Sequence, residues 1–396
     1  MENPKIRFKG FTKDWEQRKF SDIATRESSI STSTTDVPSV EYEDVIAEEG
    51  RLNKDIHLKE AVKSGITFDG SQVLYGKLRP YLHNWLNPDF KGIAVGDWWV
   101  LKPINMDKKF LYRLIQTQQF DNIANQSSGS KMPRADWNLI SNSEFMVPFS
   151  KEEQSKIGIY FDSLDHLITL HQRKCEQTKK LKKYMLQKMF PQNGAKVPEI
   201  RFYGFTYDWE QRKLKEIADK VSEKNKNNEF SEPFTNSAEQ GIISQKDYFD
   251  REIVNNENLD SYYIVRNDDF IYNPRISVTA PVGPINRNRL GRNGVMSPLY
   301  TVFRTHDIDN LYLEFYFKTT KWHRFMKLNG DSGARFDRFT ISSTQFMEMP
   351  IPYPMLDEQR KMGEYFDSLD HLITLHQRKC DELKKMKKYM LQNMFI

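Results

Sequence analysis

The sequence predicts an α+β protein with a pseudo-twofold internal repeat, in which two mixed α/β domains are separated by a pair of long antiparallel helices forming a coiled coil. Two observations predict this fold class. Two segments of the chain each occur twice, in the same order, and one of them has the heptad spacing that a coiled coil requires. Because each copy encloses a block of mixed helix and strand patterns, we expect one domain at each end of the helix pair.

The recurring segments form a frame around blocks that differ. Residues 4–24 return as 198–218 with fifteen of twenty-one positions identical, and residues 160–190 return as 365–395 with twenty-six of thirty-one identical. The enclosed blocks show no comparable similarity to each other. Drift after a duplication would erode all segments alike, so we infer that the two frames do one common job and the two blocks do different jobs.

The second recurring segment predicts a long helix in each copy. It contains neither Gly nor Pro, and its seam residues follow steps of three and four. We expect Cys175 and Cys380 to be small buried thiols, near the middle of their helices, with no redox task. The predicted seam consists of Phe161, Leu164, Ile168, His171, Cys175 and Thr178 in the first copy, and of Phe366, Leu369, Ile373, His376, Cys380 and Leu383 in the second.

The two enclosed blocks have the same layout of strand and helix patterns, which implies one fold carrying two specificities. The first has strand patterns at 66–78, 93–103 and 144–149 and a helical pattern at 108–124, and the second has strand patterns at 261–273 and 299–305, a helical pattern at 311–328 and an exit segment at 346–354.

At 396 residues, the chain is too long for one ordinary core, so two to three domains are expected. The repeat sets their limits: a first domain at 1–150, a first long helix at 151–190, a linker at 191–197, a second domain at 198–354 and a second long helix at 355–396.

Composition narrows the class of protein. Lys and Arg number 59 against 54 Asp and Glu, and this net charge of +5 is a weak indication of a polyanionic partner. No apolar run reaches the ~18 residues of a membrane span, and the first residues lack the apolar core of a secretion signal. Two cysteines are too few for a disulfide scaffold. We therefore expect a cytoplasmic protein that has no membrane partner.

Catalytic motifs are incomplete. Gly76 and Lys77 lack the leading glycine and the following hydroxyl of a phosphate-binding loop. The segments 87–90 and 297–300 resemble the Asn-Pro-Pro-aromatic loop of amino-methyltransferases, but both lack the second proline, and no glycine-rich loop offers a place for a methyl donor. The His and Cys residues have no zinc-ligand spacing. The sequence predicts no catalytic residue, no metal site and no cofactor in this chain.

Basic, hydrogen-bonding and aromatic residues gather in the predicted loops of both blocks. Arg and Lys read guanine edges and neutralise phosphates, Asn reads adenine, and hydroxyls serve either. Six arginines against two acidic residues in 266–304 make ordinary solvated loops a poorer explanation there. The candidate DNA-binding residues are Lys77, Arg79, Tyr81, His83, Asn84, Ser128, Ser130, Lys131 and Arg134 in the first block, and Asn273, Arg275, Ser277, Thr279, Arg287, Arg289, Arg292, Asn293, Arg335 and Arg338 in the second.

The outer faces of the two predicted helices are also alike. The first sixteen residues of the helical repeat, 160–175 and 365–380, are identical at every heptad position, whereas a seam needs only its own residues. Ordinary core packing is the alternative explanation. Identity of the outer face predicts two copies of one docking surface, with partner-binding residues Asp162, Asp165, Gln172 and Arg173 in the first copy and Asp367, Asp370, Gln377 and Arg378 in the second.

Together these motifs resemble the DNA-specificity subunit of type I restriction-modification systems. The likeness rests on P-x-I-R-F-x-G-F-T-x-D-W-E-x-R-K before each block, GKLRPY in the first, YNPR and NGVMSPLYTVF in the second, and YFDSLDHLITLHQRK in each helix. It covers essentially the whole chain.

The resemblance implies a non-catalytic subunit with two target-recognition domains, each reading half of a split site in double-stranded DNA. It also implies two modification (methyltransferase) subunits docked on the helices, with restriction subunits joining that complex. S-adenosylmethionine, ATP and Mg would bind in those partners. The alternative that the residues leave open is a stand-alone DNA-binding regulator built as a fused pseudo-dimer.

Overall fold

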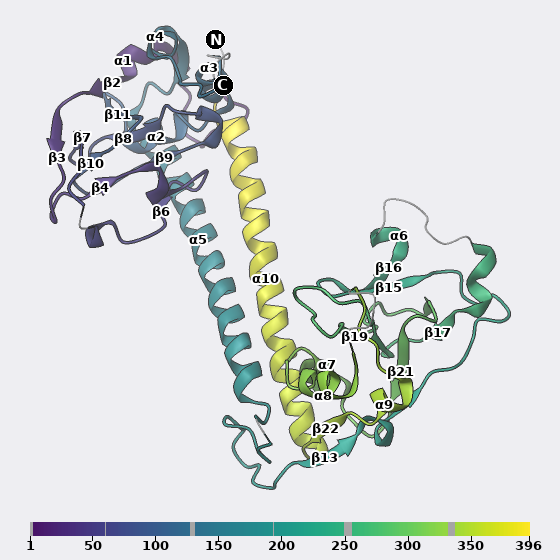
Figure 1. The fold of residues 1–396 in the computed structure, drawn as a ribbon. Helices are drawn as coiled ribbons and strands as arrows, with labels where there is room; N and C mark the ends of the chain where they lie inside the picture. The colour runs from purple at the N-terminus through teal and green to yellow at the C-terminus, as the bar shows by residue number, and fades with distance from the viewer. Residues whose placement is uncertain (1–2, 60, 127–130, 193, 249–255, 332–336) are drawn as a thin grey trace. The chain divides into compact units, whose positions relative to one another are not determined.

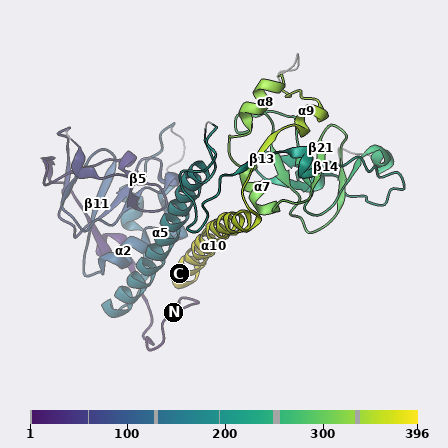
Figure 2. The same cartoon turned by 90° about the horizontal axis from the view of Figure 1, so that it is seen from below.

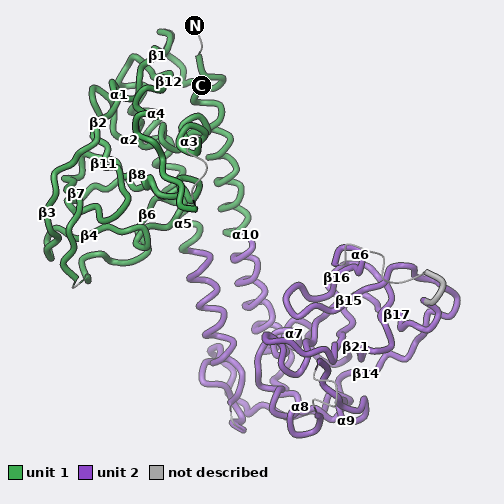
Figure 3. The backbone as a smooth tube through the Cα atoms, turned by 45° about the horizontal axis from the view of Figure 1, so that its top comes forward, with its two compact units in different colours: residues 1–173, 376–396 green, residues 174–375 purple. Residues whose placement is uncertain are grey.

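A computed structural model of the chain describes residues 3–59, 61–126, 131–192, 194–248, 256–331 and 337–396. They form two compact units (Figure 3). Unit 1 comprises residues 1–173 and 376–396, and unit 2 comprises residues 174–375. Each unit therefore contains one mixed α/β domain and one segment of each long helix.

The domain of unit 1 is built on two four-stranded sheets, in the orders β2-β11-β8-β9 and β3-β7-β10-β4, with two small ribbons, β1-β12 and β5-β6 (Figure 1). The first of these sheets is antiparallel throughout. The elements are β1 Glu16–Lys19, α1 Phe20–Ile23, β2 Ala24–Glu27, β3 Ile30–Thr32, β4 Ser39–Val40, β5 Val45–Ile46, β6 Arg51–Leu52, β7 Ser64–Phe68, β8 Val73–Gly76, β9 Trp85–Leu86, β10 Gly92–Ala94, β11 Trp98–Pro103, α2 Lys108–Leu114, α3 Gln118–Ala124, α4 Trp137–Asn142 and β12 Glu144–Val147.

The domain of unit 2 has one four-stranded antiparallel sheet, in the order β14-β21-β18-β19, and three two-stranded ribbons, β13-β22, β15-β16 and β17-β20. The elements are β13 Glu210–Lys213, β14 Ala218–Lys220, β15 Phe234–Ser237, β16 Gly241–Ser244, α6 Gln245–Tyr248, β17 Tyr263–Val265, β18 Phe270–Tyr272, β19 Ile285–Arg287, β20 Gly294–Met296, β21 Thr301–Thr305, α7 Asn310–Phe317, α8 His323–Asn329, α9 Ser343–Met347 and β22 Pro350–Tyr353.

The sheets β2-β11-β8-β9 and β14-β21-β18-β19 are equivalent, strand for strand. Ala24 pairs with Pro103 in the first, and its repeat counterpart Ala218 pairs with Thr305 in the second. This register fixes every other equivalence in the two sheets, which sequence similarity could not do. The α+β fold class with two domains and two long helices is thus confirmed.

The two long helical patterns of the domains, 108–124 and 311–328, are each broken in two, contrary to the prediction of one helix. A threonine stands at the break in both domains. Thr117 caps α3, and its Oγ1 donates a hydrogen bond of 2.7 Å to the Leu114 carbonyl. Thr319 makes the same 2.7 Å bond to the Tyr316 carbonyl after α7. The hydroxyl ends the first helix because it takes up a carbonyl that the helix leaves free.

The long helices α5, Lys151–Lys188, and α10, Leu356–Met394, pack side by side (Figures 1 and 2). In unit 1 the rings of Phe161 and Phe395 lie 6.2 Å apart, and Nδ1 of His171 lies 3.0 Å from Nδ1 of His376. These contacts join the early part of α5 to the late part of α10, so the segments run antiparallel. In unit 2 the counterpart rings of Phe366 and Phe190 are again 6.2 Å apart.

The first recurring segment also binds each domain to the first turn of its long helix. In unit 1 Arg7 Nε lies 2.6 Å from Oε1 of Glu153, whose side chain is almost fully buried. In unit 2 the counterparts Arg201 and Glu358 repeat the ion pair at 2.6 Å. The first recurring segment is therefore conserved between the copies for an intramolecular reason, since it holds the domain to the helix.

Most predicted seam residues are buried. Cys175 and Cys380 are buried thiols, as expected, and lie in different units. None of the helices in the described ranges combines the length and the apolar character that a membrane span requires.

Candidate nucleic-acid interface and helix surface

Two loops that the sequence proposed for DNA binding meet in unit 1. The first connects β8 to β9, and the second precedes α4. Arg79 N donates to the Pro133 carbonyl at 2.7 Å, and Ala135 N donates to the Lys77 carbonyl at 2.8 Å. These bonds place Lys77 and Arg79 directly beside the segment that carries Arg134.

One carboxylate holds the charged side chains of this junction. Asp97 accepts hydrogen bonds from Arg134 Nε at 3.2 Å and from Nη2 at 2.9 Å, and Lys77 Nζ lies 3.6 Å away. The hydrogen bond from Arg134 lowers the pKa of Asp97. Arg134 nevertheless keeps 52% of its side chain exposed.

The tip of the β8–β9 loop is a short 3-10 turn, Pro80–Leu82, flanked by two residues with positive φ. Arg79 has φ 49° and His83 has φ 53°. A non-glycine residue in this region costs about 1–3 kcal/mol, and such strain persists only where the surroundings enforce it. The turn exposes the side chains of Tyr81 (52%) and Leu82 (42%), and its backbone conformation is fixed by the surrounding structure.

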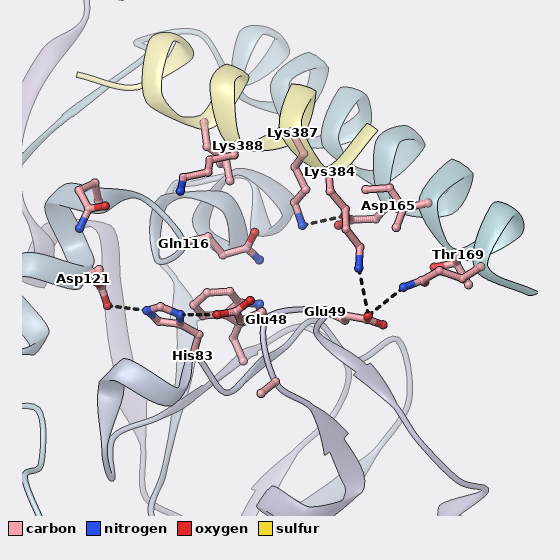
Figure 4. A pocket seen from close by; sticks show the side chains of 16 residues that line it. Glu48, Glu49, His83, Gln116, Asp121, Asp165, Thr169, Lys384, Lys387 and Lys388 are labelled. Carbon is pink, nitrogen blue, oxygen red and sulfur yellow. Dashed lines mark hydrogen bonds and ion pairs between the residues drawn. The ribbon is translucent and has the colours of Figure 1, made fainter. Parts of the chain in front are cut away.

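The predicted DNA-binding residues His83 and Asn84 do not belong to the exposed tip of this loop. Nε2 of His83 lies 3.0 Å from Asp121 Oδ1, and its Nδ1 lies 3.3 Å from Glu48 Oε1. Asn84 is buried. His83 instead lines a cavity of about 480 Å³ inside unit 1, between the domain and the helices (Figure 4).

Charged groups face each other across that cavity and are largely paired. Lys387 Nζ lies 2.7 Å from Asp165 Oδ1, and Lys384 Nζ lies 3.8 Å from Glu49 Oε1 (Figure 4). Burial lowers the pKa of Lys387, although Asp165 opposes this. The cavity belongs to the attachment of the domain to the helices rather than to a DNA-reading surface.

Unit 2 repeats the loop junction of unit 1. Ile276 N donates to the Asp337 carbonyl at 3.0 Å, and Phe339 N donates to the Pro274 carbonyl at 2.8 Å. Isolated β-bridges join Arg275 to Arg338, as they join Leu78 to Arg134 in unit 1. The predicted residues Arg275 and Arg338 are thus brought together.

The tip of the unit 2 loop is a tight turn from Ser277 to Ala280. The two residues exchange backbone hydrogen bonds of 3.0 and 3.2 Å, and Ser277 Oγ lies 3.2 Å from Thr279 Oγ1. Val278 at the corner is fully exposed. Asn273, at the base of the loop, donates to the Asn236 carbonyl at 2.8 Å and serves the domain's own structure.

The other arginines of the predicted basic stretch are held in ion pairs. Arg287 Nε and Arg289 Nε lie 2.9 and 2.8 Å from Glu314 Oε2, and Arg289 also reaches Asp367 of α10 at 2.9 Å. Arg292 makes a two-pronged pair with Glu232, with both distances 2.8 Å. Asn293 accepts from the Asn267 backbone at 3.0 Å.

Three predicted residues, Ser128, Ser130 and Arg335, lie outside the described part of the chain. Lys131, which follows the first of these gaps, is exposed.

Five of the eight predicted partner-binding residues hold the protein's own parts together. Arg113, 1% exposed, binds Asp162 at 2.6 Å and Asp165 at 2.7 Å. Burial would lower the pKa of Arg113, but the two carboxylates raise it overall. Gln172 donates to Glu49, Asp367 accepts from Arg289, and Asp370 accepts from Lys182. Arg173, Gln377 and Arg378 are exposed.

Among the exposed apolar residues of the long helices, three are exposed at equivalent repeat positions in both units, and sequence reasoning missed them. These are Leu167, Met386 and Tyr389 in unit 1, and their repeat counterparts Leu372, Leu181 and Tyr184 in unit 2, which are 40–57% exposed. We call each set an apolar trio. The sequence signal was an apolar pair three residues apart beside the seam, Met386 with Tyr389 and Leu181 with Tyr184, and apolar residues exposed in this way are candidates for a binding surface.

No group of three or more His, Cys, Asp or Glu residues in the described ranges is arranged to hold a metal ion. The geometry is that of a binding protein, with two equivalent loop junctions on two equivalent domains, each joined to one part of a common helix pair.

Known proteins share this organisation. The profile of the type I restriction-modification DNA specificity domain matches residues 12–180 and again 207–385. The MjaVIII specificity subunit of a type I restriction enzyme from Methanocaldococcus jannaschii is 25% identical over 303 residues, which cover 72% of this chain and 69% of that protein.

Solved structures show the same fold. The S subunit of a type I restriction-modification system from M. genitalium aligns over 100% of this chain and 99% of its own, with a TM-score of 0.57 and 15% identity. A chain from a study of the assembly and conformational transition of the type I system aligns over 96% and 97%, with a TM-score of 0.51 and 18% identity. The chain belongs to the type I restriction-modification DNA-specificity family, whose members are the non-catalytic specificity subunits.

Proposed function

We propose that this chain reads a bipartite target in double-stranded DNA, with one domain for each half-site, and that its helices position two modification subunits. The observation that carries the proposal is the loop junction that recurs in both domains with different residues at its tip. Two half-sites of different sequence require the same backbone arrangement in both domains and different side chains at the loop tips.

The apolar trios support the second part. Equivalent residues of the same kind are exposed once in each unit, and tyrosine and methionine are enriched at the centre of protein interfaces. A stand-alone regulator would have no use for two such exposed surfaces, so they favour the subunit over that alternative. Restriction subunits would join through the modification subunits.

The chemistry would lie in the partners. S-adenosylmethionine would bind in the modification subunits, with ATP and Mg also required outside this chain, and the whole complex would act in the cytoplasm. This chain would contribute DNA binding, positioning and spacing.

The test is to map methylated adenines in cells that carry the modification subunit with and without this chain. We expect methylation only when the chain is present, at a split motif with two unlike halves separated by a fixed number of unread base pairs. Methylation at an undivided motif, or methylation that does not depend on the chain, would overturn the proposal.

A further inference from the structure

Arg134 and Arg338 occupy equivalent places in two domains whose sequences are otherwise unlike. Arg134 bridges to Leu78, the second residue after β8, and Arg338 bridges to Arg275, the third residue after β18. The residues on either side make the same backbone hydrogen bonds in both domains. The same side chain is therefore presented at the same point of the same fold.

Resting on the proposed function, we propose that Arg134 and Arg338 contact backbone phosphates in both half-sites, and that base discrimination belongs to the adjoining loop residues that differ. Two half-sites of unequal sequence share only their sugar-phosphate backbone. A residue kept at one position in both domains fits that shared feature, whereas residues that differ fit the bases.

The loops beside these arginines do differ at every matched position. The sheet register and the bridges make Leu78 equivalent to Arg275, and Arg79 equivalent to Ile276. Each domain thus has one arginine without a basic counterpart, Arg79 in unit 1 and Arg275 in unit 2. Among the described residues neither guanidinium forms an ion pair within 4.0 Å. Arg275 is exposed, and Arg79 is half-buried with an unpartnered Nε, so each has donors left for the two acceptors of a guanine edge.

The exposed tips add a second set of unlike residues. Unit 1 presents Tyr81 and Leu82, and unit 2 presents Val278 and Thr279. Apolar groups recognise the thymine methyl in the major groove, and a hydroxyl accepts or donates to a base edge. Backbone hydrogen bonds within each turn fix the conformation of both tips, so less conformational entropy is lost when they bind DNA.

A second pair of basic residues occupies matched positions in the two domains. Arg26 on β2 and Lys220 on β14 are counterparts in the sheet register. In unit 2, Lys220 and Arg338 line one cavity of about 300 Å³ with the hydroxyls of Thr340 and Ser343. Lys220 Nζ donates to Ser343 Oγ at 2.9 Å. Cations beside hydroxyls are the groups that bind phosphate oxygens.

The test measures the affinity of the full chain for synthetic duplexes by fluorescence anisotropy. The duplexes are the motif obtained from methylation mapping, single-base variants in each half-site, and a random sequence. Arg134→Ala and Arg338→Ala should each weaken binding about three- to tenfold, by the same factor on every duplex, and lower the salt slope by about one between roughly 50 and 200 mM salt.

Arg79→Ala and Arg275→Ala should behave differently. Each should lose about ten- to a hundredfold on the motif alone, relax one position in one half-site only, and leave binding to the random duplex unchanged. Arg338→Lys, which keeps the charge and the fold, should recover most of the affinity lost in Arg338→Ala, because a phosphate accepts a point charge whereas a bidentate guanine contact does not. Lys196→Ala, on an exposed loop, controls for the loss of one surface charge.

The outcomes separate the two levels of the proposal. If the unmodified chain binds all duplexes alike, the proposed function fails. If it prefers the motif but Arg134→Ala or Arg338→Ala changes the preference at one base pair, or leaves every affinity and the salt slope unchanged, the assignment to phosphates is wrong.

Discussion

Asp165 of α5 and Lys387 of α10 form an ion pair of 2.7 Å in unit 1, and their repeat counterparts Asp370 and Lys182 form the same pair at 2.6 Å in unit 2. Because the partners come from different copies of the repeat, neither copy can complete its pair alone. The identity of these helix positions is therefore explained by the helix pair itself, and Asp165 and Asp370 are structural residues first.

Asp165→Asn should destabilise unit 1. The change leaves Lys387, 14% exposed, and the buried Arg113 without one carboxylate. We expect a loss of about 1–3 kcal/mol in the free energy of unfolding, between the values for surface and for fully buried pairs. Urea unfolding of the full chain measures it.

The matched variant is Asp370→Asn, which removes the carboxylate in unit 2. There Phe315 occupies the position of Arg113, so only Lys182 loses its partner and the cost should be smaller. Equal losses for the two variants would contradict a role for Arg113. A double variant, Asp165→Asn with Lys387→Met, should recover part of the stability, because it removes the unpaired ammonium as well.

Partner docking should depend on the apolar trios. Tyr389→Ser should reduce the number of modification subunits that co-purify with this chain from two to one, and Tyr184→Ser should do the same through the other unit. The double variant should bind none, since a truncated interfacial tyrosine commonly costs about 2 kcal/mol or more. Native mass spectrometry counts the subunits.

Variants of the exposed charged residues on the same helices test the alternative docking surface. If Arg173→Ala with Arg378→Ala abolishes co-purification while the tyrosine variants retain two subunits, the docking surface is the charged one that the sequence alone favoured. Circular dichroism of each variant checks that the helices remain folded.

Acid should destabilise unit 1 through a buried carboxylate. Asp44 is 0% exposed, and burial would raise its pKa, but hydrogen bonds from Lys59 and Lys54 more than offset this and lower it. A depressed pKa in the folded state stabilises the protein above the unfolded pKa of about 3.9, and the contribution is lost as the pH falls through the folded value.

The difference in unfolding free energy between the unmodified chain and Asp44→Asn should therefore be constant above about pH 5 and shrink as the pH falls towards 3. Urea unfolding over this range measures it. A difference that grew on acidification would mean that Asp44 is held with a raised pKa.

The sequence was sufficient to predict the recurring segments and their helices. It was insufficient to predict the contacts of the side chains that these segments position. Heptad spacing predicted the seam from Phe161 to Cys175 because burial along a helix follows its period. The sequence could not show that Arg113 would enter the core, because its partners Asp162 and Asp165 lie 49 and 52 residues away.

The candidate DNA surface was predictable in part for a similar reason. Loop composition found Arg134 and Arg338, but the backbone hydrogen bonds that make them equivalent join segments far apart along the chain. Composition also grouped Arg287, Arg289 and Arg292 with the base-reading residues, whereas carboxylates of distant segments pair with all three. Charge density along the chain cannot distinguish a paired arginine from one that faces a ligand.

The repeat leads to a last prediction, that residues 1–197 form a homodimer. In unit 1 the core includes Cys380, Leu383 and Met394 of α10 and Phe395, which follows the helix. The fragment lacks them, and leaving the seam in water is unfavourable. A second copy of the fragment carries the counterparts Cys175 and Thr178 on its own α5 and Met189 and Phe190 directly after it, and an antiparallel pairing would bring them to the same places. Size-exclusion chromatography with light scattering gives the mass.

The weak point of this dimer is the one seam position that changes character, Thr178 in place of Leu383, which is 5% exposed in unit 1. Thr178→Leu should therefore tighten the dimer by roughly 1–2 kcal/mol per buried side chain, and Phe190→Ser should abolish it. Under the proposed function, the dimer presents the first domain twice in opposite orientations, so it should select a palindromic site from random DNA. A monomeric fragment that Thr178→Leu leaves monomeric would show that the two helix copies are not interchangeable.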